Sequence, residues 1–394
     1  MVTWVGKDGC SYCGACGAAC PRGCIYYSQD EEGFYYPDKD TSKCDNCGLC
    51  ERVCPSLRPF ERQEPLRAYA CKHKEAEIRG ASSSGGVFYA LASYVIGNGG
   101  VVFGAAMDKD NRCVHTYVEN PDGLRSLMGS KYVQSYLDGV FPAVKGFLEQ
   151  GRTVLFTGTP CQVAGLKHYL RRDYDNLYCA DLICHGVASP GVLEAYTIDA
   201  EKKYRLDVRE IRFRHKNKGW NLVDSMVLSD RRGHTVQTRG DKYLTGFMGN
   251  YFLRLSCASC RANGYRSGAD ITLGDYWGGA LVLKGFDDGQ GVSAVIIRSE
   301  KGRGLFDGVS PALDALPAEI GHIARFNHNL EGSSKHSPKR EAFFADYRKD
   351  KDFGRLAAKY IKPRLAGAAK RILGAKTVYR LFDLYKGRGG GGEA

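Results

Sequence analysis

Apolar and polar positions alternate in blocks along most of the chain. Short apolar runs at Val154–Phe156 and Leu177–Ile183 are each followed by a stretch of helical periodicity, over Gln162–Leu170 and from Pro190 onward. A further strand-like run, Ile271–Leu273, comes later in the chain. Strands that alternate with helices in this way predict an α/β domain whose sheet contains parallel pairs.

The segment Ser82–Met107 contains no charged residue and is long enough to raise the question of a membrane span. The sequence Gly-Asn-Gly-Gly at Gly97–Gly100 lies within it and is typical of a turn. This turn divides the segment into a helix over Val87–Ile96 and a following strand. We therefore predict no transmembrane segment.

Two runs of four cysteines lie within the first 55 residues, and both have the spacing C-x2-C-x2-C-x3-C-P. In this pattern three thiolates of one run bind one [4Fe–4S] cube, and the fourth, at the start of a short helix, reaches the other cube. The first cluster is therefore assigned to Cys10, Cys13, Cys16 and Cys54. The second cluster is assigned to Cys44, Cys47, Cys50 and Cys20.

Zinc is the alternative metal, since it also binds paired C-x-x-C motifs. A zinc site is complete with four ligands and has no use for the third cysteine or for a fourth followed by proline, so we favour iron. Cys24 follows the first run and is predicted to be a core residue. The aromatic segment Ile25–Pro37, with a polar turn at its centre, predicts a hairpin between the two runs. This region offers no acid, base or pocket, so its predicted role is electron transfer.

Composition restricts the cellular setting and the class of partner. Sixteen cysteines in 394 residues without an N-terminal signal pattern do not indicate a disulfide-stabilised secreted protein, so we expect a reducing cytoplasm. The formal net charge is +12, but a [4Fe–4S] core held by four thiolates carries roughly −2. Three such clusters would lower the net charge to about +6, so nucleic-acid binding is not predicted.

A loop of serines and glycines, Ser82–Gly86, directly precedes the helix predicted from Val87. Backbone amides and hydroxyl groups at a helix N-terminus stabilise an anion such as a pyrophosphate. A simple serine N-cap with flexible glycines is the alternative.

Four more cysteines follow in the α/β region. Cys161 and Cys184 each come directly after a predicted strand, at the sheet edge where ligands bind in open α/β sheets. Cys257 and Cys260 form a C-x-x-C pair, which is a weak signal by itself. Four is the number of thiolates that a cube requires, although Cys161 and Cys184 taken singly would more often be buried core residues.

Several motifs in the same order make this region resemble the beta-subunit family of coenzyme F420-reducing hydrogenases and dehydrogenases, which includes chlorophyll-pathway reductases. The resemblance spans roughly Ala68 to Phe306. The motifs that carry it are Ser83-Ser84-Gly85-Gly86, Gly129-Ser130-Lys131-Tyr132, Gly158-Thr159-Pro160-Cys161-Gln162, Cys184-His185-Gly186, Cys257-Ala-Ser-Cys260 and Asp270-Ile-Thr-Leu-Gly-Asp275.

The resemblance implies FAD and, beside it, a third [4Fe–4S] cluster. The implied ligands of that cluster are Cys161, Cys184, Cys257 and Cys260. The implied FAD contacts are Ser83, Ser84, Gly85, Gly86, Gly129, Ser130, Lys131, Tyr132, Gly158 and Thr159. The candidates for substrate binding or proton delivery are Lys131, Tyr132, His185 and Asp275. Three of them have an ordinary alternative role: Lys131 as a phosphate counter-ion, His185 as a partner of cluster sulfur and Asp275 as a helix cap.

Clusters carry one electron at a time, and a flavin links single-electron transfer to two-electron chemistry. The leading interpretation is an FAD-dependent reductase of a small organic substrate, fed by ferredoxin or a similar low-potential donor. The family's bacterial single-chain members suggest polysaccharide biosynthesis as its setting. The alternative is an electron-transfer adaptor, using coenzyme F420 or ferredoxin, that feeds a partner enzyme.

The expected fold class is α+β: a two-cluster ferredoxin-like domain (1–62), an α/β flavin-binding domain with a mixed sheet (63–330) and a basic helical tail (331–394). From Arg355 to Arg388 there are ten Lys or Arg residues and one acid, interleaved with apolar residues and interrupted by Pro363. This pattern suits an amphipathic helix on an anionic membrane or a partner, and a solvated tail is the alternative. The basic segment Arg214–Trp220 suits either an acidic substrate such as a sugar nucleotide or a solvated turn, and we favour the turn.

Overall fold

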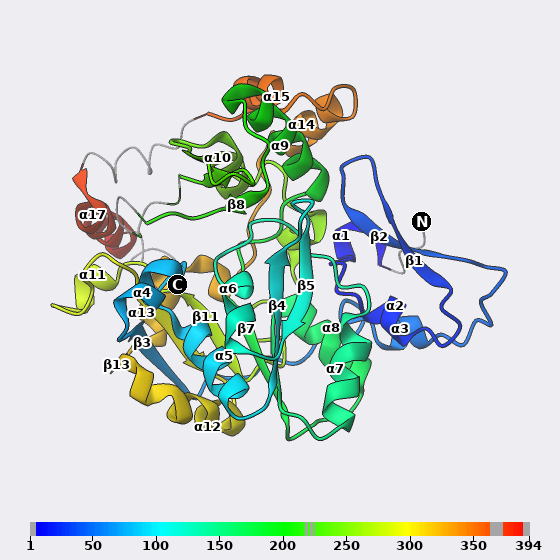
Figure 1. The fold of residues 1–394 in the computed structure, drawn as a ribbon, viewed down its shortest axis with the longest axis horizontal. Helices are drawn as coiled ribbons and strands as arrows, with labels where there is room; N and C mark the ends of the chain where they lie inside the picture. Colours follow the sequence, from blue (N-terminus) through cyan, green and yellow to red (C-terminus); the bar gives the residue numbers. More distant parts are fainter. Residues whose placement is uncertain (1–4, 217–219, 221–222, 224, 363–372, 389–394) are drawn as a thin grey trace.

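The cysteine-rich N-terminal segment lies against one side of an eight-stranded sheet in the computed structural model of the chain (Figure 1). The described residues are 5–216, 220, 223, 225–362 and 373–388. The strand order in the sheet is β13-β3-β12-β11-β7-β6-β4-β5. In that order the strands are Leu313–Pro317, Arg67–His73, Ser293–Ile297, Ile271–Asp275, Leu177–Leu182, Val154–Thr157, Val101–Met107 and Cys113–Val118.

The four central strands β4, β6, β7 and β11 run parallel, and the flanking pairings are antiparallel. Their side chains alternate between two buried faces. In β6, for example, Leu155 packs with one hydrophobic cluster, whereas Val154 and Phe156 pack with another. Burial on both faces explains why these strands are short, continuous apolar runs in the sequence.

Helices cover both faces of the sheet. One face packs against α5 (Val87–Gly97) and α12 (Glu300–Val309), and the other against α7 (Val140–Glu149) and α8 (Pro160–Leu170). The shorter helices of this region are α4 (Ala76–Ala81), α6 (Leu124–Leu127), α11 (Gly279–Val282) and α13 (Ile320–Phe326).

A second layer lies at one end of the sheet (Figure 1). It contains a small antiparallel sheet and helices whose apolar side chains share one core. The strands are β8 (Glu210–Arg212), β9 (Val227–Ser229) and β10 (Thr235–Gln237). The helices are α9 (Pro190–Tyr204), α10 (Lys242–Met248), α14 (Arg340–Tyr347) and α15 (Phe353–Tyr360).

The N-terminal segment contains the predicted hairpin, β1 (Ile25–Gln29) paired with β2 (Tyr35–Lys39), and three short helices. These are α1 (Gly6–Gly9), α2 (Ala15–Ala19) and α3 (Leu49–Arg52). Cys13, Ala15 and Val53 share the core under α7 and α8, and Phe34 and Tyr36 share the core with α9 and α14. The head therefore packs on the body through two hydrophobic cores.

The predicted fold class is confirmed in its secondary-structure arrangement, and so are the strand after Gly97–Gly100 and the helix that begins at Pro190. One local expectation is wrong. Cys20 and Cys54 follow the short helices α2 and α3 instead of opening a helix. In each run the short helix therefore comes before the fourth cysteine, which lies just after the C-terminal end of that helix.

The segment beyond residue 331 does not extend away from the body as far as Ile361. Phe353, Leu356 and Tyr360 of α15 are buried in the core that they share with α9 and α10. Pro363, proposed to interrupt the basic helix, lies outside the described residues. Within the described part of the chain, no helix is long and apolar enough to cross a membrane.

Candidate functional site

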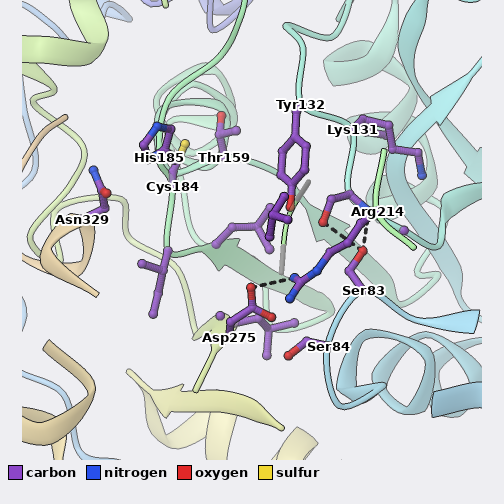
Figure 2. A pocket seen from close by; sticks show the side chains of 18 of the residues that line it. Ser83, Ser84, Lys131, Tyr132, Thr159, Cys184, His185, Arg214, Asp275 and Asn329 are labelled. Atoms are coloured by element: carbon purple, nitrogen blue, oxygen red, sulfur yellow. Dashed lines mark hydrogen bonds and ion pairs between the residues drawn. The ribbon is translucent and has the colours of Figure 1, made fainter. Parts of the chain in front are cut away.

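A cavity of about 730 Å³ opens where the carboxyl ends of β6, β7 and β11 meet (Figure 2). All four candidate catalytic residues line it: Lys131, Tyr132, His185 and Asp275. So do nine of the ten predicted flavin contacts: Ser83, Ser84, Gly86, Gly129, Ser130, Lys131, Tyr132, Gly158 and Thr159. A cavity of this size is within the range of cofactor and ligand sites.

The serine-glycine loop forms one wall of the cavity through a close backbone approach. Gly85, which does not line the cavity, lies against β3 and β12, because a Cβ atom on it would come within 2.2 Å of the Cys71 carbonyl oxygen. Gly86 has φ +94° and is the N-cap of α5 without a side-chain hydrogen bond. The first amides of α5 are therefore available to an anion.

Ser83 joins this loop to the second predicted flavin loop. Its hydroxyl oxygen accepts hydrogen bonds from the backbone N–H (2.7 Å) and the hydroxyl (2.9 Å) of Ser130. Two motifs separated by 47 positions thus form one wall.

Lys131 reaches the C-terminal end of α6 instead of standing free in the cavity. Its Nζ atom donates to the carbonyl oxygens of Ser126 (3.2 Å), Leu127 (3.0 Å) and Met128 (2.7 Å). Burial lowers the pKa of this amine to about 8. The side chain therefore brings a buried positive charge to the cavity wall at neutral pH.

Asp275 at the end of β11 pairs with Arg214, whose Nη1 atom lies 2.7 Å from the Asp275 carboxylate (Figure 2). Arg214 also donates to the Trp220 carbonyl oxygen at 2.6 Å and lies over the rings of Trp220 and Trp277. The Arg214 side chain is buried and that of Asp275 is half-buried, and within the described residues the Arg214 Nε and Asp275 Oδ1 atoms have no hydrogen-bond partner.

This arrangement corrects two sequence interpretations. Arg214 does not belong to a solvated turn, because it lies inside the cavity wall. Asp275 does not cap a helix, because its carboxylate pairs with this arginine. The basic segment was the feature of the sequence that pointed to Arg214. The pairing of Arg214 with Asp275, 61 positions away, could not be deduced from that segment.

His185 and Tyr132 also line the cavity. The Nε2 atom of His185 lies 3.3 Å from the Phe247 carbonyl oxygen and its Nδ1 atom lies 3.5 Å from the Ser334 hydroxyl. The Tyr132 ring stacks on Phe247 at 4.8 Å between centroids, and burial raises the pKa of its hydroxyl. Tyr132 is therefore a neutral hydroxyl at physiological pH.

The four body cysteines converge next to the cavity, which Cys184 itself lines. Burial raises the pKa of the Cys184 thiol, and its proximity to Cys257, Cys161 and Cys260 raises it further. The Thr159 hydroxyl lies 3.2 Å from the Cys161 sulfur. Half-buried thiols gathered this closely are unfavourable as free thiolates, and a cationic iron core would remove that cost. The residues present therefore fit a cluster.

The first predicted head set is also gathered. Burial raises the pKa of Cys13, and the neighbouring Cys16, Cys54 and Cys161 raise it further. Cys10 is likewise a neighbour that raises the pKa of Cys16 and of Cys54. These four thiols, the predicted ligands of the first cluster, also fit a cube.

The second head set is more open. Cys47 is exposed, Cys44 and Cys50 are half-buried, and Cys50 lies near Cys47. Cys20 approaches Cys24, with 3.2 Å between their sulfur atoms, and Cys24 in turn lies near Cys44. The predicted core residue Cys24 is buried, and it sits between two predicted ligands.

All sixteen cysteines, each of which is within the described residues, are free thiols. A zinc ion requires four ligands at about 2.0 to 2.3 Å from one point. No three His, Cys, Asp or Glu side chains in the described parts of the chain are arranged to hold a single ion.

Helix α8 brings the head and body thiols together. It begins with a capping box between Thr159 and Gln162, and it carries Cys161 in its first turn. One turn later, Gly165 lies against the head, where a Cβ atom would come within 2.8 Å of the Cys13 Cβ atom. Only a glycine allows this approach, so one face of α8 contacts a predicted ligand of each set.

Comparisons with known proteins agree with this two-part organisation. Residues 9–57 match the 4Fe-4S dicluster domain, and residues 151–316 match the C-terminal part of the coenzyme F420 hydrogenase/dehydrogenase beta-subunit family. The chain is 26% identical over 312 residues to a coenzyme F420-dependent sulfite reductase of Methanocaldococcus jannaschii, covering 76% of the chain and 46% of that protein.

It is also 23% identical over 164 residues to one of the F(420)H(2) dehydrogenase subunits of Methanosarcina mazei, covering 39% of the chain and 46% of that protein. The matched segments thus span about half the length of each of these relatives. Among solved structures, a chain of the F420-reducing [NiFe] hydrogenase complex from Methanosarcina barkeri aligns with a TM-score of 0.46 and 18% identity, covering 75% of this chain and 92% of that one. Residues 9–57 therefore match a 4Fe-4S dicluster domain, and residues 151–316 carry the C-terminal part of the coenzyme F420 hydrogenase/dehydrogenase beta-subunit family.

Proposed function

We propose that this chain is an electron-transfer subunit that passes electrons between a deazaflavin coenzyme of the F420 type and a partner enzyme. The path runs from a flavin in the cavity, through a body cluster, to the two head clusters. The observation that carries this proposal is the position of α8, which holds Cys161 of the body set one turn from the glycine that contacts Cys13 of the head set.

The cavity supports FAD as the bound cofactor. The uncapped start of α5 behind Gly86 is suited to the pyrophosphate, and Ser83 and Ser130 add hydroxyl groups to the same wall. The buried amine of Lys131 adds positive charge. Bound FAD would accept a two-electron hydride equivalent and release single electrons, which is the conversion that links a deazaflavin to clusters.

The remaining chemistry belongs to the side chains around the cavity. Arg214 and Asp275 form an ion pair in the cavity wall beside the Trp277 ring, so they offer charged groups to a polar planar ligand. Tyr132, neutral and held by Phe247, keeps water from the centre of the cavity. Cys184 lies both in the cavity wall and among the body thiols, so electrons leave the cavity there.

The partner enzyme lies at the head. The exposed Cys47 brings the second head set to the protein surface, whereas Cys10 and Cys13 are buried. The two relatives' names, a coenzyme F420-dependent reductase and a dehydrogenase subunit, favour this adaptor over the reductase of a small organic substrate. They lend no support to a role in polysaccharide assembly. Ferredoxin remains an alternative partner at the same surface.

The test uses anaerobic protein with its iron and flavin quantified. Reduced coenzyme F420 should reduce the flavin and then all clusters, followed by visible absorption and EPR. Cys161→Ala should retain the flavin and its reduction but leave the head clusters oxidised. Cys179→Ala is the control, because Cys179 is a thiol on β7 outside the three sets and is more deeply buried than Cys161.

Retained flavin absorbance and an unchanged melting profile must be established for Cys161→Ala first. Head clusters that become reduced at the wild-type rate in this variant would contradict the path through the body cluster. Wild-type flavin that is not reduced by reduced F420, but is oxidised by a small organic acceptor, would instead support the reductase alternative.

A further inference from the structure

Arg254 lies between the head and the body and is fully buried, with 0% of its surface exposed. It directly precedes the 3-10 helix Leu255–Ser259, which carries Cys257. Its side chain enters the head, where the Nε atom donates to the Cys10 carbonyl oxygen at 2.6 Å and an Nη1 atom donates to the Tyr35 carbonyl oxygen at 3.0 Å. Its Nη2 atom lies 3.6 Å from the Cys10 sulfur.

The other contacts of this guanidinium are aromatic or neutral. It lies over the Tyr36 ring at 4.0 Å and the Phe34 ring at 5.6 Å from the centroids, and Nη1 also reaches the Gln134 side-chain oxygen at 3.3 Å. Among the described residues, no carboxylate lies within ion-pair distance of Arg254. A buried guanidinium without a counter-charge is strongly unfavourable in a protein interior.

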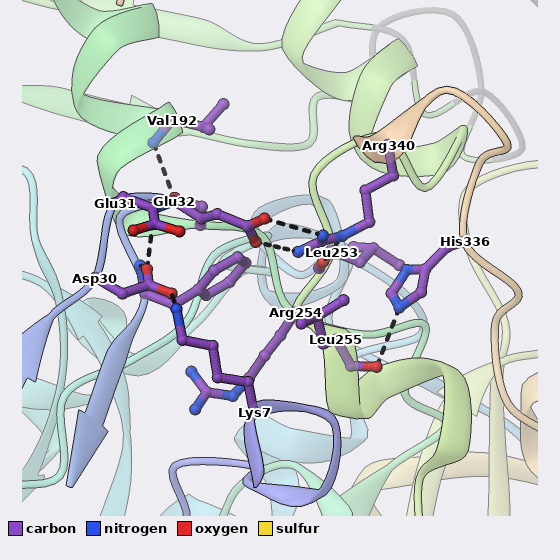
Figure 3. A network of polar contacts seen from close by, with 12 residues as sticks. Lys7, Asp30, Glu31, Glu32, Val192, Leu253, Arg254, Leu255, His336 and Arg340 are labelled. Atoms are coloured by element: carbon purple, nitrogen blue, oxygen red, sulfur yellow. Dashed lines mark hydrogen bonds and ion pairs between the residues drawn. The ribbon is translucent and has the colours of Figure 1, made fainter. Parts of the chain in front are cut away.

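Arg340 in the same network shows how a buried arginine is usually stabilised, by pairing with a carboxylate (Figure 3). It is also buried, and its Nη2 atom lies 2.5 Å from the Glu32 carboxylate, while its Nε atom donates to the Leu253 carbonyl oxygen at 2.8 Å. One buried arginine is thus neutralised by a carboxylate, and its neighbour faces a predicted cluster ligand. A [4Fe–4S] cube with four thiolates carries roughly −2, which supplies the missing counter-charge.

The charge of Arg254 also extends to the body set. Burial raises the pKa of Cys161 and of Cys257, and the nearby Arg254 guanidinium partly offsets the rise in both. Only Cys10, however, is in direct contact. The charge should therefore act on the first head cluster most strongly, at the point where that cluster approaches the body.

We propose that Arg254 is a positioning residue that holds the first head cluster against the body and raises its reduction potential. When one electron enters, the iron–sulfur core changes from +2 to +1 and the cluster with its thiolates from about −2 to about −3. No bond or proton changes, and Arg254 stabilises the added negative charge. The proposal rests on head clusters being present, and it is independent of whether coenzyme F420 is the carrier.

The test is an EPR-monitored redox titration of anaerobic protein without substrate. Arg254→Gln should lower the midpoint of one head cluster by at least roughly tenfold in the reduced-to-oxidised ratio, or about 59 mV for a one-electron couple. Arg254→Lys, which keeps the charge, should recover more than half of that shift. Arg340→Gln is the matched control and should leave the head-cluster midpoints unchanged, because that charge is paired with Glu32 and, among the described residues, contacts no head cysteine.

Iron content and two head-cluster EPR signals at wild-type level must accompany each titration, so loss of clusters is distinguished from loss of tuning. Unchanged midpoints in Arg254→Gln, or an equal shift in Arg340→Gln, would overturn the proposal. If Arg254→Gln does not retain iron, wild-type protein grown with 15N-arginine provides the test. Pulsed EPR should then detect a changed nitrogen coupling on a reduced head cluster, and an unchanged coupling would also overturn it.

Discussion

Gly165 on α8 offers a direct test of how the head is seated on the body. A Cβ atom at this position would lie 2.8 Å from the Cys13 Cβ atom, 3.0 Å from its carbonyl oxygen and 3.0 Å from its sulfur. None of these atoms is the free end of a flexible side chain, and a bound cluster would hold the sulfur in place. Gly165→Ala must therefore move α8 away from the head.

Two effects of opposite sign decide the magnitude. Alanine in a helix interior gains about 1 kcal/mol over glycine, whereas overpacking typically costs about 1–3 kcal/mol. Gly146→Ala in the adjacent α7 is the matched control, because a Cβ atom there would have no neighbour within 4 Å. It should gain about 0.5–1 kcal/mol. Gly165→Ala should therefore be about 1–3 kcal/mol less stable than Gly146→Ala, a factor of roughly five to 150 in the unfolding equilibrium.

The assay is anaerobic urea unfolding of both variants, followed by circular dichroism and by cluster absorption. Electron transfer from the flavin to the head clusters should also slow in Gly165→Ala, because its two thiol sets are moved apart. If Gly165→Ala is as stable as Gly146→Ala and transfers electrons at the wild-type rate, Cys13 is not seated on α8 and the proposed route is wrong.

Two further predictions concern the body. Anaerobic protein should contain about twelve iron atoms if it holds three four-iron clusters, and Cys257→Ser with Cys260→Ser should remove about four of them; a value near eight in both proteins would exclude the third cluster. Burial lowers the pKa of His115 to about 4 from 6.5, and its ring nitrogens lie 2.9 Å from the Ser135 hydroxyl and 2.9 Å from the Thr157 carbonyl oxygen. The unfolded chain therefore binds the extra proton between these pH values, so about 3 kcal/mol of stability present above pH 6.5 should be lost as the pH falls toward 4. Urea titrations at several pH values should show this loss in the wild type but not in His115→Gln, and parallel pH profiles would refute the assignment.

Local sequence was enough to predict features that depend on a few neighbouring residues. The C-x2-C-x2-C spacing brings three thiols together within one loop, whatever the rest of the chain does. The Gly97–Gly100 turn likewise separates α5 from β4 by local conformation alone. The placement of Cys161 and Cys184 at one sheet edge also followed, because parallel strands bring their carboxyl ends together.

Contacts between distant residues could not be predicted in this way. Arg254 meets Cys10 across 244 positions, and Arg214 meets Asp275 across 61. In sequence each is one basic residue among 56. Basic residues are mostly exposed in folded proteins, so a solvated turn was the natural expectation for Arg214. Only the packing of the chain shows which arginines lose their water and what charge they face instead.

The relation of the head to the body was likewise decided by tertiary structure. The motifs predicted cysteine sets but contained no information on which set lies next to which. That order depends on the approach of Cys13 to Gly165 and on two hydrophobic cores that join residues of the head to α7, α8, α9 and α14. A glycine inside a helix reads in sequence as a weak helix former. In the structure its missing side chain is what allows the two thiol sets to lie on one face of α8.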